Sequence, residues 1–270
     1  MQLEGKTVVL TGASGGIGQA IARELSLAGA RLALLGRREQ ALEQTATPLR
    51  NSGSEVVSIA ADLSTAQGRA TALASLHSAL PAVDVLINNA GTQSFAPLPQ
   101  VSEDDLETLI RTNLVAPMAL TRALLPAMIA RGSGRVVNIG STFGTLGFAC
   151  FSIYSASKFG LRGFSEALRR ELAGSGVEVC YVAPRGTRTD FNPGTLYRMA
   201  DATGMNMDEP ARVGQSVRKA LEKDRKEVYI GFPESLFVRI NALFPRLVDR
   251  ALRKQNQSVA AFAAANPTGD

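Results

Sequence analysis

Tyr154 and Lys158 stand four residues apart, in Tyr154-Ser155-Ala156-Ser157-Lys158, at the start of a segment with helical periodicity. Residues with that spacing share a helix face, so the phenol and the ammonium point into the same space. A free phenol has a pKa of about 10, which is too high for useful proton exchange at neutral pH, and a neighbouring cation lowers it. The pair is therefore suited to passing a proton to or from a substrate oxygen, although this spacing alone often arises by chance.

Two more polar residues precede this pair in the chain. Ser141 follows the apolar run 135–139, and Asn113 lies inside a long helical stretch at 106–128. A serine hydroxyl beside a reacting oxygen can stabilise the negative charge that develops there. Ser141, Tyr154 and Lys158 are therefore candidate catalytic residues, and Asn113 joins them through the family resemblance that the glycine spacing supports.

A glycine-rich turn, Thr11-Gly12-Ala13-Ser14-Gly15-Gly16-Ile17-Gly18, follows the first apolar run of the chain. Glycines at such a turn let the backbone bend tightly and approach a pyrophosphate, and they let the next helix pack closely on the sheet. The helix N-terminus then offers free N–H groups to the phosphates. The turn predicts a dinucleotide site that includes Gly12, Ser14, Gly15, Gly16, Ile17 and Gly18.

The elements that must position these residues follow from hydrophobic periodicity. Short apolar runs occur at 7–10, 31–35, 56–60, 83–87, 135–139, 177–182 and 228–230. Longer stretches with helical periodicity separate them, at 17–27, 39–49, 106–128 and 159–172. Continuously apolar strands alternating with helices indicate a parallel sheet covered on both faces. We expect one α/β domain over residues 1–254, a doubly wound Rossmann fold with about seven strands.

Local signals refine this interpretation. Ser102 followed by Asp105 predicts a helix N-cap, and Gly132 predicts the end of that helix. The proline- and glycine-rich segment 184–212 reads as a mobile substrate loop at the carboxyl ends of the strands.

The chain ends in an amphipathic segment at 234–254, predicted to be a helix kinked near Pro245. Its apolar face is expected to pack against the body or a second subunit, and docking on a membrane surface is the less favoured alternative. Residues 255–270 read as a disordered tail.

The glycine spacing Gly12-x3-Gly16-x-Gly18, with the Asn113, Ser141, Tyr154 and Lys158 series behind it, resembles the classical short-chain dehydrogenase/reductase family over about residues 5–235. The resemblance implies that Tyr154 exchanges a proton with a carbonyl oxygen and that Ser141 hydrogen-bonds that oxygen. It implies that Lys158 lowers the Tyr154 pKa and binds the nicotinamide ribose. Asn113 would hold a water in a proton relay, at a place where its helix is bent.

The end of the second strand bears on the choice of cofactor. NAD-specific relatives place a carboxylate there, whereas this chain has Gly36 followed by Arg37 and Arg38. An arginine can bind a 2′-phosphate through charge-assisted hydrogen bonds, so NADP(H) is expected, with Arg37 as the contact. The alternative is that both arginines are only solvated, and Gly15 stands where some NADP-dependent members have a basic residue.

The resemblance assigns the remaining cofactor contacts. These are Asp62 and Leu63 after the third strand, Asn89, Ala90 and Gly91 after the fourth, and Pro184, Thr187 and Thr189 after the sixth, together with Tyr154 and Lys158. The family usually has Pro-Gly where this chain has Pro184-Arg185. Arg185 and Arg188 could face an anionic substrate group, the cofactor pyrophosphate or solvent.

Composition excludes several classes of protein. The single histidine argues against chemistry that needs two imidazoles, and two cysteines cannot make a disulfide framework or a cysteine zinc site. No metal site is expected. The net charge of +5 with no tryptophan makes nucleic-acid binding improbable, and the N-terminus lacks a signal-peptide pattern, so a cytoplasmic protein is expected.

The sequence thus favours an NADP(H)-dependent oxidoreductase that reduces a carbonyl to an alcohol. Its substrate could be a 3-oxoacyl thioester, with an acyl carrier as partner, or a hydrophobic ketone. A cofactor-sensing protein without turnover is the alternative, and an extended-type epimerase is less favoured because of chain length and glycine spacing. The resemblance also implies a homodimer or homotetramer formed through the helices near 104–130 and 152–173.

Overall fold

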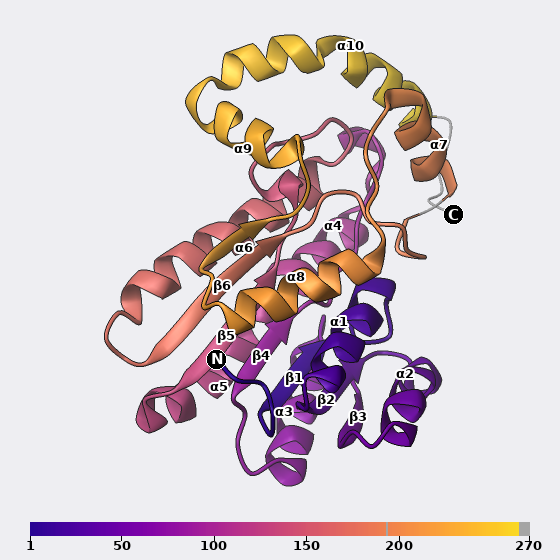
Figure 1. The fold of residues 1–270 in the computed structure, drawn as a ribbon. Helices are drawn as coiled ribbons and strands as arrows, with labels where there is room; N and C mark the ends of the chain where they lie inside the picture. Colours follow the sequence, from indigo (N-terminus) through magenta and orange to yellow (C-terminus); the bar gives the residue numbers. More distant parts are fainter. Residues whose placement is uncertain (193, 265–270) are drawn as a thin grey trace.

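Seven strands form one sheet in which every neighbouring pair is parallel, in the order β3-β2-β1-β4-β5-β6-β7 (Figure 1). The strands are β1 (Thr7–Thr11), β2 (Arg31–Gly36), β3 (Val56–Ala60), β4 (Val85–Asn88), β5 (Gly134–Ile139), β6 (Val177–Ala183) and β7 (Glu227–Tyr229). The computed structural model describes residues 1–192 and 194–264. The expected seven-stranded doubly wound sheet is confirmed.

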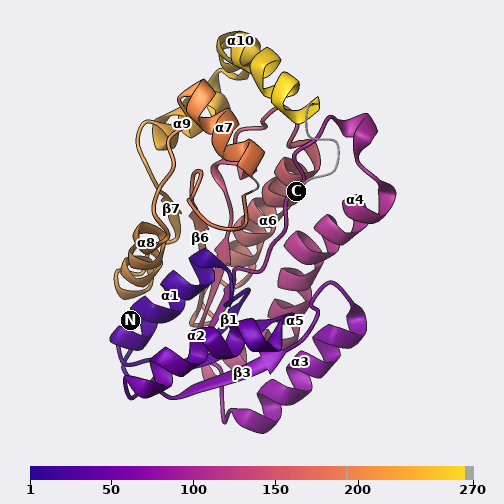
Figure 2. The same cartoon turned by 90° about the vertical axis from the view of Figure 1, so that its right-hand side faces the viewer.

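Helices cover both faces of the sheet (Figure 2). One face carries α1 (Gly16–Leu27), α2 (Glu39–Asn51) and α8 (Pro210–Glu222), and the other carries α3 (Ala66–Ala79), α5 (Ala116–Arg131) and α6 (Ser152–Glu171). Successive residues of a strand point to opposite faces, so Val8 and Leu10 pack under α1 while Val9 packs on the other side. All three are fully buried, which explains why the strands read as continuous apolar runs.

The helical stretch over residues 103–131 consists of α4 (Glu103–Ile110), a π-helical turn η2 (Arg111–Val115) and α5. The Ser102 hydroxyl accepts a hydrogen bond from the Asp105 N–H, and Gly132 ends α5 with φ of 65°. Both predicted boundaries are therefore confirmed. By length and composition alone this stretch could cross a membrane. In this fold it lies along the sheet and packs on α3, α6 and β5.

The region after β6 contains more helix than the sequence indicated. Within the expected loop, α7 (Gly194–Thr203) forms, and the predicted C-terminal helix is two helices, α9 (Glu234–Leu243) and α10 (Pro245–Ala264). The expectation of a disordered tail from residue 255 is wrong up to Ala264, because Val259 and Ala263 are fully buried against the α7 side chains Leu196 and Met199. Residues 265–270 lie outside the described residues.

These C-terminal helices form a cap beyond the carboxyl ends of the strands (Figure 1). A third apolar cluster lies beneath the cap and combines α7 and α10 with Phe95, Phe148 and Phe151 of the body. The cap therefore closes one side of the region where ligands bind in sheets of this type.

Candidate active site

Tyr154 and Lys158 lie one turn apart near the start of α6, as their spacing predicts. The Lys158 ammonium lies 5.8 Å from the centre of the Tyr154 ring and donates a hydrogen bond of 2.9 Å to the Ile139 carbonyl. Ser141 follows β5, and its hydroxyl accepts a hydrogen bond from the Phe143 N–H. Ser141 and Tyr154 line the same cavity, so the structure brings three of the four predicted catalytic residues together.

Asn113 lies in the π-helical turn, where the helix was expected to bend. Its side chain is fully buried and bonds to both backbone groups of Thr92, at 2.8 Å each, and to the Ser157 hydroxyl at 3.1 Å. Ser157 in turn donates to the Tyr154 carbonyl. Asn113 therefore connects the long helix to the turn of α6 that carries Tyr154 and Lys158. The sequence did not identify Thr92 and Ser157 as partners of Asn113, because no spacing rule links them to it.

Burial has the largest effect on the pKa values of Tyr154 and Lys158. It raises the pKa of Tyr154 to about 12, against the opposing effect of the Ser141 hydroxyl. It lowers the pKa of Lys158 to about 8. In the protein alone the pKa of Tyr154 thus lies above its usual value, because desolvation of the phenolate outweighs the hydrogen bond with Ser141.

The glycine-rich turn leaves no room for side chains at three positions. Gly12 has φ of +64°, and a Cβ there would lie 2.7 Å from the Ala90 Cα. A Cβ on Gly18 would lie 2.2 Å from the Gly12 carbonyl oxygen, and one on Gly16 would lie 2.6 Å from Thr189. No side chain among the described residues caps the N-terminus of α1, so its N–H groups face the turn without a side-chain acceptor.

The Asn89-Ala90-Gly91 segment is joined to this turn. The Asn89 amide donates to the carbonyls of Thr11 and Gly12, and the Thr11 hydroxyl accepts from the N–H groups of Asn89 and Ala90. A Cβ on Gly91 would lie 3.3 Å from the Asn113 amide oxygen and 3.8 Å from the Lys158 nitrogen. The glycine turn and the catalytic group are therefore parts of one continuous site.

The end of β2 has the expected basic character. A Cβ at Gly36 would lie 3.4 Å from the Ser14 hydroxyl, so Ser14 and the exposed Arg37 flank the same corner. Burial acts to raise the pKa of Asp62, but hydrogen bonds from Ser64 and the positive charge of Arg37 lower it overall. Arg37 and Asp62 thus lie near each other, at the end of the site where the adenosine part of a dinucleotide is expected. The Leu63 side chain packs in the core, which leaves only its backbone for a cofactor.

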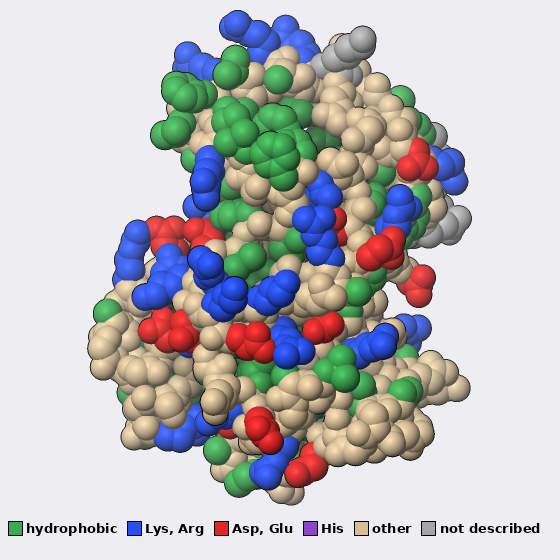
Figure 3. Space-filling view, viewed as in Figure 1, with side chains coloured by type: hydrophobic (Ala, Val, Ile, Leu, Met, Phe, Trp, Pro, Cys, Tyr) green, Lys and Arg blue, Asp and Glu red, His purple; other side chains and the backbone are tan. Residues whose placement is uncertain are grey.

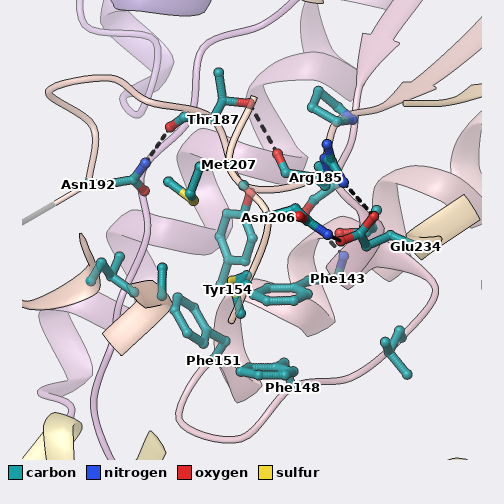
Figure 4. A pocket seen from close by; sticks show the side chains of 18 of the residues that line it. Phe143, Phe148, Phe151, Tyr154, Arg185, Thr187, Asn192, Asn206, Met207 and Glu234 are labelled. Carbon is teal, nitrogen blue, oxygen red and sulfur yellow. Dashed lines mark hydrogen bonds and ion pairs between the residues drawn. The ribbon is translucent and has the colours of Figure 1, made fainter. Parts of the chain in front are cut away.

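A cavity of about 320 Å³ opens beside Tyr154 and Ser141. Its wall includes the stacked rings of Phe143 and Phe148, 4.8 Å apart, and Phe151 (Figure 4). The cap and the segment around α7 supply further apolar lining that the sequence did not assign to the site: Leu196, Met199, Met205, Met207, Phe237, Val238 and Leu252. Four of the predicted cofactor contacts, Ile17, Pro184, Thr187 and Thr189, also line this cavity, so the glycine turn and the segment after β6 border it.

Arg185 lines the cavity, but two carboxylates pair with its guanidinium. Its guanidinium makes two hydrogen bonds to Asp208, of 2.8 and 3.0 Å. A third, of 2.7 Å, goes to Glu234 (Figure 4). Asp208 is only 4% exposed, so two carboxylates neutralise Arg185 in a largely buried cluster. Arg188 is exposed and pairs with Glu209 at 3.6 Å. In the part of the chain that the structure describes, no group of His, Cys, Asp and Glu side chains could hold a metal ion.

Comparison with known proteins agrees with this geometry. The sequence profile of the short chain dehydrogenases matches residues 6–197. The chain belongs to the short-chain dehydrogenase/reductase family. It is 36% identical to the ketoacyl reductase HetN of Nostoc sp., covering 93% of this chain and 89% of that one.

Solved structures of the family have the same fold. A metagenomic short-chain oxidoreductase in complex with NADP is 34% identical, with a TM-score of 0.73, covering 85% of this chain and 98% of that chain. A family member from Burkholderia phymatum in complex with NAD is 25% identical, with a TM-score of 0.81, covering 92% and 96%. Members of the family thus bind either nicotinamide cofactor. The chain is accordingly an oxidoreductase that acts on CH–OH and C=O groups with such a cofactor.

Proposed function

We propose that the protein is an NADP(H)-dependent reductase of carbonyl compounds that carry an apolar chain or ring system. The observation that supports this most directly is the pair of hydroxyl groups of Tyr154 and Ser141 at the wall of an otherwise largely apolar cavity. Such a cavity stabilises apolar substrate surface, and the two hydroxyls provide the polar contacts for one oxygen.

The roles of the residues follow from their positions. Tyr154 donates a proton to the carbonyl oxygen, and its raised pKa keeps the phenol protonated at neutral pH. Ser141 hydrogen-bonds the same oxygen and stabilises the negative charge that develops there. NADPH, when bound, supplies the hydride.

Lys158 and Asn113 support this reaction from behind Tyr154. The buried Lys158 ammonium lies beside Gly91, where it can bind the ribose hydroxyls of a cofactor. Asn113 fixes the turn of α6 that carries Tyr154 and Lys158, because it bonds to Ser157 of this turn and to the Thr92 backbone. Because glycines 12, 16 and 18 let the turn pack against Ala90, Thr189 and its own backbone, the N–H groups at the N-terminus of α1 can bind a pyrophosphate.

The preference for NADP(H) rests on Arg37. Gly36 provides no carboxylate to repel a 2′-phosphate, and Arg37 is exposed beside it. Replacing Arg37 with alanine removes a charge-assisted contact to the phosphate, so we expect KM for NADPH to rise roughly 10- to 100-fold. The KM for NADH serves as the internal control and should change little. Equal effects on the two cofactors, or a wild-type preference for NADH, would contradict this assignment.

The substrate class can be resolved further. Because Asp208 and Glu234 neutralise Arg185, the loop after β6 offers less positive charge to an acyl carrier than its sequence indicates. The similarity to a ketoacyl reductase nevertheless keeps 3-oxoacyl thioesters within the proposed class. Initial rates of NADPH oxidation should be compared between medium-chain 3-oxoacyl thioesters, hydrophobic ketones and small polar ketones. Turnover confined to the polar ketones would contradict the proposal.

We also propose self-association through α5 and α6. Met118 of α5, Phe159 of α6 and Val115, which directly precedes α5, are apolar side chains with 37–41% exposure. Light scattering should give a mass of two or four chains, and a monomer mass would contradict this proposal.

A further inference from the structure

A set of exposed apolar side chains extends from just before α9, along α9 and into the first turn of α10. We call it the elbow patch, and it consists of Phe232, Leu236, Phe237, Leu243, Phe244 and Leu247, which are 46–73% exposed. Figure 3 shows apolar side chains gathered over the α9–α10 region, with basic side chains along its outer edge. A cluster of this kind on a soluble domain marks an interaction surface.

The patch is separate from the face that holds these helices to the protein. Val238, Val248 and Val259 are buried on the inner side, and the Asn241 amide anchors α9 by a 2.9 Å hydrogen bond to the Thr145 carbonyl. The apolar face of this segment therefore packs against the body of the protein, which is one of the two expected arrangements. This packing accounts for the inner apolar side chains and leaves the elbow patch without a partner among the described residues.

Basic side chains accompany the patch. Arg239, Arg246, Arg250 and Arg253 are all exposed, and residues 236–253 contain one acidic residue, Asp249. Arg246, Arg250 and Arg253 follow the i, i+4, i+7 spacing of one helix face, next to the side that bears Leu247. Within the described ranges none of the four arginines forms an ion pair.

The patch is also continuous with the cavity beside Tyr154. Phe237 is 46% exposed on the outside and also lines the cavity, and its neighbours Pro233 and Val238 line it too. Two helices therefore carry an apolar outer surface on one side and the apolar wall of the candidate site on the other. An apolar molecule leaving a lipid layer at the patch would be close to the cavity.

We infer that the α9–α10 elbow docks on an anionic lipid surface. Apolar side chains beside a row of arginines are the composition of a helix that lies at a membrane interface, where the arginines meet lipid phosphates. A two-fold contact with a second copy fits less well, because it would bring the two arginine rows close together. The inference does not depend on turnover.

Vesicle sedimentation with the full chain tests the inference. Binding to phosphatidylcholine vesicles should be compared with binding to vesicles of equal parts phosphatidylcholine and phosphatidylglycerol. We expect binding to the anionic vesicles only. Each basic residue near such a surface contributes about 1 kcal/mol, so the double variant Arg246→Glu with Arg250→Glu should bind at least about tenfold more weakly.

Two further double variants separate charge, apolar contact and general basicity. Leu243→Gln with Leu247→Gln should weaken binding by a similar factor, because both side chains are more than half exposed and would enter the lipid. Arg23→Glu with Lys219→Glu reverses two exposed charges on α1 and α8 and should leave binding within about twofold. All variants should keep the wild-type thermal midpoint and the turnover of a water-soluble carbonyl without vesicles.

Several results would overturn the inference. These are no binding to anionic vesicles, equal binding to both vesicle types, or an equal loss in the α1/α8 control variant. If the patch variants differ from the wild type in their mass by light scattering, but bind vesicles as the wild type does, the patch is a contact between copies of the chain instead. If vesicle binding behaves as expected and no carbonyl is reduced, the proposed function fails and the docking inference stands.

Discussion

At the scale of single residues, the site contains two groups whose burial opposes their charged forms. Burial keeps the Tyr154 phenol neutral, which is the form that donates a proton, but it also makes this phenol a weaker acid than a free one. The Lys158 ammonium is destabilised, because its side chain is buried and its one hydrogen bond among the described residues goes to the Ile139 carbonyl. The lysine therefore lowers the stability of the folded chain at neutral pH, as functional groups in active sites often do.

Replacing Lys158 with methionine should stabilise the fold and abolish activity. Burial lowers the pKa of Lys158 from 10.5 to about 8, so the folded state holds the charged form at a cost that is fully present below about pH 8. Allowing for the lost hydrogen bond, we expect a gain in unfolding free energy on the order of 2 kcal/mol at about pH 7. Urea denaturation measures this gain.

The pH dependence distinguishes this cause from better packing. Between about pH 8 and 10.5 the unfolded chain binds more protons at Lys158 than the folded chain does, so wild-type stability rises with pH relative to the variant. The advantage of Lys158→Met should therefore shrink from about pH 8 to 10, below the titration of Tyr154. A constant difference across this range would show that burial of the charge is not the reason.

At the scale of elements, Arg185 joins three segments that are distant in sequence. It connects the end of β6 to Asp208, just before α8, and to Glu234 at the start of α9, so the cap and the segment around α7 share one ion-pair cluster. A Cβ on Gly231 would lie 2.6 Å from the Arg185 side chain, which shows how closely this guanidinium is packed.

Arg185→Ala should destabilise the protein by about 2 kcal/mol, because it leaves the buried Asp208 carboxylate with Arg212 as its only remaining ion-pair partner among the described residues. Arg212→Ala is the matched control. Arg212 is 53% exposed and pairs with the same carboxylate, so its removal should cost less than about 1 kcal/mol. Chemical denaturation of both variants gives the comparison, and equal costs would contradict a structural role for Arg185.

The sequence predicted the strands and the glycine turn, because each depends on local patterns such as apolar runs and fixed glycine spacing. The bend at Asn113 was implied only by the resemblance to the short-chain dehydrogenase/reductase family. The sequence did not predict the partners of Arg185, because Asp208 and Glu234 lie 23 and 49 residues further along the chain. It likewise missed the cap as a wall of the cavity. An amphipathic pattern marks an apolar face but does not identify what that face packs against, and α10 extends through residues whose composition alone resembles a tail.

At the scale of the whole molecule, the candidate site extends along one edge of the sheet and has two parts with different roles. The glycine turn and Arg37 lie over β1 and β2, whereas Tyr154, Ser141 and the cap enclose the cavity over β5 and β6. Asn89 and Gly91, between them, contact the turn on one side and approach Lys158 on the other. A cofactor bound along this edge would bring its nicotinamide end towards Tyr154, which is the arrangement that carbonyl reduction requires.

The most direct test of the account is the initial rate of NADPH oxidation with a hydrophobic ketone or a 3-oxoacyl thioester, measured for the wild type and for Tyr154→Phe. The variant keeps the ring and removes only the hydroxyl, so NADPH binding, followed by fluorescence, should be retained. We predict that kcat falls by at least about 10²-fold, since the proton donor is lost. Wild-type turnover that persists in Tyr154→Phe would contradict the central claim that this phenol supplies the proton.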